Sequence, residues 1–200
     1  MKLISLTFLF FVFLYSLQIN ALTLAQKGLL DLQDFDFNHK IISLDGQWEF
    51  YYNQLYTPQF FEKGKIIQKN YIQVPSSWKG KVFNNTKLPQ TGCATYRLQI
   101  YLGKNTLHNL ALLIPKIDSS YSIYINKKLI KTVGKIGQKP EDYIPMWKQV
   151  IIDIPQTQNT LEIIFHISNY YYSKAGITSS ILLGDRQLII SHFSKNIAIK

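Results

Sequence analysis

The chain has 200 residues, of which 46% are hydrophobic and 14% aromatic, and a formal net charge of +10. Its length and apolar content suit one domain with a hydrophobic core and leave no room for a second one. The basic residues are scattered, without a run of five or more and without a ribonucleoprotein signature, so we expect no nucleic-acid partner. The single cysteine, Cys93, cannot form an internal disulfide, and the fold must be stabilised by packing.

The amino-terminal residues have the pattern of a secretory signal. Lys2 precedes an apolar run from Leu3 to Leu17, and a short polar stretch ends at Ala21. The apolar run is shorter than the ~20 residues of a membrane helix, which favours a cleaved signal over the alternative of an uncleaved anchor. Cleavage is expected after Ala21 or after Ala25. We therefore expect an exported protein, in the periplasm or on the extracytoplasmic face of a membrane.

The predicted domain begins with a lead-in and a strongly patterned strand. Residues 22–38 have mixed polarity and include an expected edge strand at 31–37. The core is predicted to begin at 41–52, where Trp48 and Phe50 alternate with polar neighbours. Because successive side chains of a strand point to opposite faces, both rings are expected in the core.

A second strand is predicted over 94–102 by strict alternation. One face carries Tyr96, Leu98, Ile100 and Leu102, and the other carries Thr95, Arg97, Gln99 and Tyr101. Arg97 therefore points outward. There it either pairs with a surface carboxylate or offers its guanidinium fork to a sugar carboxylate or hydroxyl pair.

The rest of the chain adds further strands and one long loop. Strands are expected over 109–115, 120–125, 128–133, 149–154, 160–168 and 179–183, with an irregular loop from 134 to 148. The residues after Asp185 are predicted to form a helix or a last strand. Eight or nine strands with no helix before Asp185 indicate an all-β sandwich.

Aromatic residues are the candidate ligand contacts. Asn169, Tyr170 and Tyr171 follow a strand, and tyrosine rings combine flat apolar faces with polar tips, as carbohydrate recognition needs. The alternative is that these rings pack on the rim of the sandwich, and Trp147 in the long loop has the same two interpretations. Trp78, in a turn, either closes the edge of the core or presents its ring to a sugar.

No residue pattern indicates catalysis, a metal site or a cofactor. The histidines and the one cysteine lack zinc-ligand spacing, and no nucleophile elbow occurs. Glycoside hydrolysis needs two carboxylates that face one sugar. The candidate carboxylates are scattered over strands and a loop: Glu49, Glu141, Asp142, Asp153 and Glu162. We therefore expect a protein that is not an enzyme.

The order of six short motifs resembles that of a known receptor family. The motifs are LDGQWEFYY (44–52), VPSSW (74–78), ATYRLQIYL (94–102), IDSSYSIYIN (117–126), VGKIG (133–137) and ISNYYYSKAGI (167–177). They resemble the extracellular sensor domain, type 2, of the 7TM receptors with diverse intracellular signalling modules (7TM-DISM receptors). That domain is similar in turn to the jelly-roll sugar-binding domain of family 2 glycoside hydrolases. The resemblance implies a jelly-roll, galactose-binding-like β-sandwich over 41–188, after a signal peptide (1–21) and a lead-in (22–40) and before a tail (189–200).

The chain departs from this family in two ways. Lys127 follows Asn126 where the families usually carry glycine, so a lysine must adopt positive φ in a hairpin turn. The chain also stops at Lys200, whereas the receptors continue into membrane helices. The expectation is a sensor ectodomain alone or a truncated receptor, with a membrane receptor partner or a missing membrane segment.

The resemblance implies that this domain binds a small extracellular ligand, expected to be a carbohydrate, as the input of a bacterial signalling receptor. The candidate ligand contacts are Trp78, Arg97, Asn169, Tyr170 and Tyr171. Two alternatives stay open: a structural or protein-interaction module of the envelope, and an orphaned accessory domain of a glycoside hydrolase.

Overall fold

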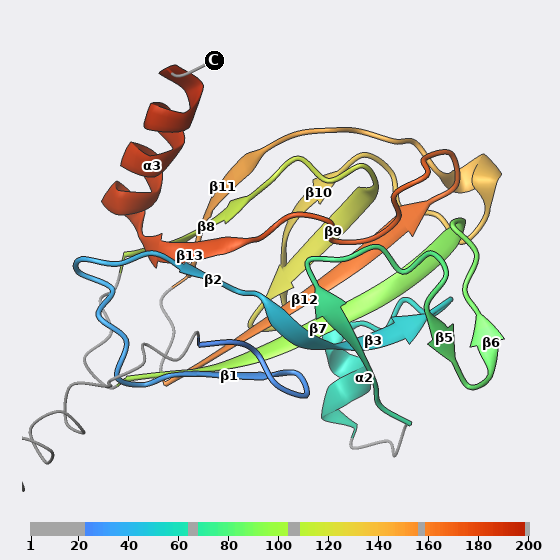
Figure 1. Ribbon diagram of the computed structural model, residues 1–200, viewed down its shortest axis with the longest axis horizontal. Helices are drawn as coiled ribbons and strands as arrows, with labels where there is room; N and C mark the ends of the chain where they lie inside the picture. The colour runs from blue at the N-terminus through green and yellow to red at the C-terminus, as the bar shows by residue number, and fades with distance from the viewer. Residues whose placement is uncertain (1–22, 64–67, 104–108, 156–158, 199–200) are drawn as a thin grey trace, which may run out of the picture.

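The computed structural model describes residues 23–63, 68–103, 109–155 and 159–198. Two β-sheets face each other as a sandwich (Figure 1), which confirms the predicted fold class. The larger sheet has the order β10 (Lys128–Val133), β9 (Ser120–Ile125), β12 (Thr160–Asn169), β7 (Gly92–Leu102), β3 (Gly46–Tyr52) and β4 (Asn70–Val74). The smaller has the order β11 (Val150–Asp153), β8 (Leu110–Ile114), β13 (Leu182–Asp185) and β2 (Ile42–Ser43). A separate hairpin joins β5 (Val82–Phe83) to β6 (Thr86–Lys87).

The core lies between the two sheets, on the face that the alternation predicted. Trp48 and Phe50 of β3 have at most 1% of their surface exposed. On β7, the four residues of the predicted apolar face are fully buried: Tyr96, Leu98, Ile100 and Leu102. β12 pairs with β7 antiparallel from Gly92 and Asn169 to Tyr101 and Thr160 and adds Leu161, Ile163, Phe165 and Ile167 to the same core. Because the side-chain period of a strand is two, the intervening residues face outward.

A short segment covers that outward face, and the sequence did not predict it. Residues 53–62, here called the strap, cross the larger sheet and contain the helix α2 (Pro58–Glu62). Thr95 Oγ1 accepts from Tyr56 N at 2.9 Å and donates to Gln54 O at 2.8 Å. His166 Nε2 lies 2.8 Å from Tyr56 O. Five residues without a side-chain cap are too few for a helix to be stable alone, so the strap depends on these contacts with the sheet.

The lead-in is part of the larger sheet. β1 (Leu29–Leu32) pairs parallel with residues Gln99 to Leu102 of β7, so the strand expected at 31–37 begins two residues earlier. Its buried residues enter the core, which therefore begins before residue 41. Gly46 permits this approach: its φ is +126°, and a Cβ there would lie 2.3 Å from Ala25 O.

The carboxyl-terminal residues form a helix, one of the two predicted alternatives. α3 (Arg186–Ala198) projects from the edge of the sandwich (Figure 1). Asp185 caps it, since its Oδ1 accepts from Gln187 N at 2.8 Å. Ile189 is fully buried in a second small cluster with Ala111 and Leu113, on the outer face of β8. Among the described residues, neither α3 nor any other helix is long and apolar enough to span a membrane.

The hairpin between β9 and β10 has the predicted strained turn. Asn126 and Lys127 have φ values of 43° and 74°. Asn126 Oδ1 accepts from Glu162 N at 2.8 Å, so the turn is bound to β12. Lysine at this position is thus tolerated, and it places a cation beside the outer face of the larger sheet.

Candidate functional site

The structure assigns Trp78 to the core and not to ligand contact. Its side chain is fully buried and packs near Phe50, Tyr52 and Tyr96, with ring centroids 6.2 to 6.5 Å apart. A ring without accessible surface cannot stack on a sugar. Of the two interpretations that the sequence allowed, closure of the core is therefore correct.

Asn169 is likewise buried, and it shapes the turn that follows β12. Its Nδ2 donates to Gln90 O at 2.9 Å and to Tyr172 O at 2.7 Å. Its Oδ1 accepts from Tyr172 N at 3.2 Å. These bonds occupy both donors of the amide and one acceptor site, so Asn169 positions the neighbouring tyrosines and does not itself face a ligand.

The tyrosines after Asn169 do meet the long loop, where they form a partly exposed aromatic cluster that we call the aromatic rim. It consists of Tyr143, Trp147, Tyr170, Tyr171 and Tyr172. Tyr171 is 60% exposed and Trp147 is 44% exposed. Each exposed ring has an aromatic neighbour behind it, since Tyr143 lies 5.5 Å from Tyr171 and Tyr172 lies 4.9 Å from Trp147 between centroids. Two exposed rings therefore have fixed orientations.

Tyr170 belongs to the support of the rim and not to its exposed surface. Its ring lies 5.4 Å from that of Tyr143, and its hydroxyl donates to Gly137 O at 3.4 Å. Burial, mainly, raises the pKa of Tyr170 to about 12. The hydroxyl is therefore a neutral donor at physiological pH. Of the predicted contacts in this cluster, Tyr171 is the most exposed, and Tyr170 is only partly exposed.

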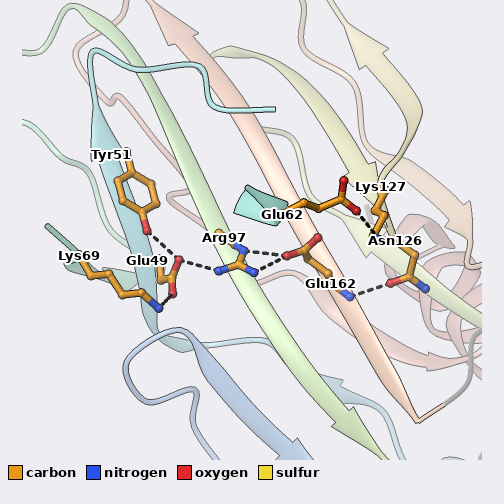
Figure 2. Close-up of polar contacts among 8 residues, drawn as sticks. All are labelled: Glu49, Tyr51, Glu62, Lys69, Arg97, Asn126, Lys127 and Glu162. Carbon is orange, nitrogen blue, oxygen red and sulfur yellow. Dashed lines mark hydrogen bonds and ion pairs between the residues drawn. The ribbon is translucent and has the colours of Figure 1, made fainter. Parts of the chain in front are cut away.

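Arg97 lies at a different place, on the outer face of the larger sheet. Its guanidinium joins two carboxylates: Nε donates to Glu162 Oε1 at 2.7 Å, and Nη1 donates to Glu49 Oε2 at 3.1 Å (Figure 2). Phe61 of the strap covers it, 4.5 Å from the ring centroid. Arg97 faces Ile164 across the sheet, and Asn169 lies five residues further along β12, a distance of about 17 Å. The predicted contacts thus divide between two sites.

The charges around Arg97 are closely paired. Glu49 is 2% exposed and also accepts from Lys69 Nζ at 2.6 Å and from the Tyr51 hydroxyl at 2.8 Å. Burial alone would raise the pKa of Glu49, but the hydrogen bonds from Lys69 and Tyr51 and the charge of Arg97 lower it overall. Glu49 is therefore ionised and fully paired. Because the ionised carboxylate of Glu49 carries no proton, it cannot act as a general acid.

Beside this network is a pocket of about 600 Å³ between the strap and the sheet. Its wall includes Phe61, Glu62, Gln99, Tyr101, Lys127 and Glu162. The sequence did not predict this pocket, because the strap was not expected and Glu162 is one of several carboxylates scattered along the chain. One signal was present: Glu49, Arg97 and Glu162 all occupy outward positions of alternating strands. Only the strand order shows that these strands are neighbours.

Glu49 and Glu162 are not arranged as a hydrolytic pair. Glycoside hydrolysis needs one carboxyl that donates a proton and one free carboxylate. Glu49 and Glu162 are instead joined through a single guanidinium. Within the described part of the chain, no group of three His, Cys, Asp or Glu side chains could hold a metal ion.

Comparisons with known proteins support the fold. No protein-family model matches the chain, and neither does any curated protein. Among solved structures, a beta-glucuronidase from Faecalibacterium prausnitzii is similar, with a TM-score of 0.54 and 14% identity over 72% of this chain and 31% of that one. A beta-glucuronidase from an uncultured Clostridium sp. gives a TM-score of 0.53 and 16% identity, over 72% of this chain and 28% of that one. The chain thus spans less than a third of these enzymes, and the likeness shows a shared β-sandwich.

A third match is named a GH2 beta-galacturonidase, from Eisenbergiella tayi, with 14% identity over 73% of this chain and 24% of that one. Its TM-score of 0.48 is too low to argue from. The two beta-glucuronidase structures therefore support the predicted β-sandwich at the level of the fold.

Proposed function

We propose that this chain is an exported, non-catalytic domain that binds carbohydrate through its aromatic rim. The observation that carries the proposal is the exposure of Tyr171 and Trp147, at 60% and 44%, on rings held from behind by Tyr143 and Tyr172. Flat rings in fixed orientations lose little conformational entropy when a sugar stacks on them, which favours binding.

The finer part of the proposal is a sensor role. The order of the six sequence motifs favours the input domain of a 7TM-DISM-type receptor. The fold is compatible with that role and equally with an accessory sugar-binding domain. The proposal of a domain without catalysis is supported by the pairing of Glu49 and Glu162 through Arg97.

A glycan array probed with the chain purified after export is the first test. We expect binding to at least one oligosaccharide, and the same sample should release no product from a chromogenic glucuronide. Tyr171→Ala should then weaken binding to that oligosaccharide about fivefold in calorimetry. This corresponds to a loss of about 1 kcal/mol for one stacking ring. The melting temperature should stay nearly unchanged, because Tyr171 is mostly exposed.

Leu129→Ala is the matched control. Leu129 is 50% exposed on β10, outside the rim, and its removal should leave the affinity unchanged. A Tyr171→Ala variant that keeps full affinity would contradict the rim as the site.

A second candidate function is protein interaction. Ile144 and Met146, beside the rim, are 57% and 49% exposed, and clustered apolar side chains are typical of protein interfaces. An array without any binding would favour this candidate.

A further inference from the structure

We infer that the pocket between the strap and the larger sheet is a second binding site, which takes a neutral monosaccharide and rejects uronic acids. The inference rests on the proposed carbohydrate class and adds a separate site and a selectivity for charge. The pocket is large enough for such a ligand. A volume of about 600 Å³ is within the usual range for small-molecule sites.

Contacts that need no ligand join the strap to the sheet on both sides of the pocket. Tyr56 of the strap is bound to Thr95 and His166 on the sheet. At the other end of the strap, Glu62 forms an ion pair with Lys127 of the β9–β10 turn (Figure 2). A preformed wall lowers the ordering cost of binding.

The charges that line the pocket cancel. The positive charges of Arg97 and Lys127 are balanced by the negative charges of Glu162 and Glu62. Glu49 does not line the pocket, and it pairs with Lys69 as well as with Arg97. Three of the five N–H groups of the Arg97 guanidinium bind Glu162 and Glu49, so a carboxylate ligand must either displace one of these residues or lie beside both of their negative charges. Separating a largely buried ion pair leaves an uncompensated charge, which is strongly unfavourable.

Hydrogen-bonding groups remain for a neutral ligand. Both bonds from Arg97 to Glu162 end on Oε1, and no described residue donates to Oε2 (Figure 2). The side-chain amide of Gln99 makes no hydrogen bond within the described residues either, and it offers both a donor and an acceptor. Tyr101, 43% exposed, adds an apolar ring face. Acceptors, a donor and a ring suit a hydroxylated ring such as a hexose.

The test is a titration of ¹⁵N-labelled full chain, purified after export, with D-glucose, D-galactose and D-glucuronate. We expect the amide signals of Gln99 and Lys127 to shift with at least one neutral sugar. D-glucuronate should bind at least about tenfold more weakly, as the loss of one charged hydrogen bond would predict.

Glu162→Gln should change the selectivity. It keeps the shape of the side chain but frees part of the Arg97 guanidinium. We expect neutral-sugar affinity to fall about tenfold and D-glucuronate binding to increase by a similar factor. Glu141→Gln, at an exposed carboxylate outside the pocket, is the control and should change neither. If Glu162→Gln fails to fold, Gln99→Ala leaves the ion pairs intact and should weaken neutral sugars alone.

Three results would overturn the inference. Equal binding of D-glucuronate and neutral sugars by the unaltered chain would exclude the charge selectivity. Shifts confined to Tyr171 and Trp147 would exclude the pocket but leave the proposed function standing. The absence of any shift with monosaccharides would also exclude the pocket, while binding of oligosaccharides at the rim is decided separately by the array and by Tyr171→Ala.

Discussion

Trp48 lies in the middle of the core, where several interactions depend on one side chain. It has no exposed surface, its Nε1 donates to Leu44 O at 2.8 Å, and its ring lies 6.1 Å from that of Phe165. Because successive side chains of β3 point to opposite faces of the sheet, a shift of one residue would move Trp48 out of the core to the outer face. Its burial therefore fixes the register of β3.

Trp48→Ala should lower the free energy of unfolding by about 3 to 5 kcal/mol, because it removes a large buried ring and leaves a cavity. A typical domain has only about 5 to 15 kcal/mol of stability, so the variant should be marginal. Urea denaturation followed by circular dichroism measures the change.

Trp147→Ala is the matched comparison, since the same residue type is removed from the surface. Trp147 is 44% exposed, and the loss should stay below about 1 kcal/mol. Equal losses for the two variants would show that the core is not where the structure places it.

At the scale of the elements, the strap depends on contact with a titratable group. His166 is buried, and its Nε2 donates to Tyr56 O while its ring lies 5.0 Å from Tyr124. Burial lowers the pKa of His166 below its ordinary value of 6.5, although the bond to Tyr56 opposes the shift. Arg97 and Glu162 share this face of the sheet and remain paired with each other.

This shift predicts a pH dependence of stability. Below about pH 6.5 the unfolded chain takes up a proton at residue 166 while the folded chain does not, so the unfolded state gains stability. The free energy of unfolding should therefore fall as the pH decreases from about 6.5 toward the lower pKa of the folded state. His166→Gln, which can still donate to Tyr56 O, should reduce this dependence between about pH 7.5 and pH 5.

His192→Gln, on α3 away from the strap, is the control and should keep the dependence of the unaltered chain. The same slope in the His166→Gln variant would contradict a neutral, buried His166.

At the scale of the whole molecule, the first residues that the structure describes are bound to the sandwich, which bears on where the predicted signal is cleaved. Ala25 is 2% exposed and bridges Gly46, with Ala25 N donating to Asp45 O at 2.8 Å and Gln47 N donating to Ala25 O at 2.7 Å. Of the two expected cleavage positions, cleavage after Ala21 leaves this bridge intact, whereas cleavage after Ala25 removes it.

We therefore expect export with a mature chain that begins at Leu22. Residues 1–26 fused to a reporter that is active only outside the cytoplasm should give activity, and mass spectrometry of the exported chain should show the loss of residues 1–21. Activity restricted to the cytoplasm would contradict export. A mature chain that begins at Gln26 would show that the bridge is dispensable.

The sequence by itself determined the faces of the main strands. Alternation in 94–102 and around Trp48 depends only on the two-residue period of a strand, which is a local property. Turn chemistry is equally local, and the strained turn at Asn126 and Lys127 was predicted. The position of β1 and the existence of α2 were not, because short elements are stabilised by contacts with distant strands and not by their own propensity.

Only the tertiary structure decided which functional groups meet. Glu49 and Glu162 are 48 and 65 residues from Arg97 in the sequence, and they converge on it because β3 and β12 flank β7. The strap then closes the pocket beside them. The sequence likewise could not decide the roles of Trp78 and Tyr171, because each was consistent with packing or with ligand contact. Local pattern predicts the face of a strand on which a residue lies, but strand order and register decide which residues share that face and which of them reach solvent.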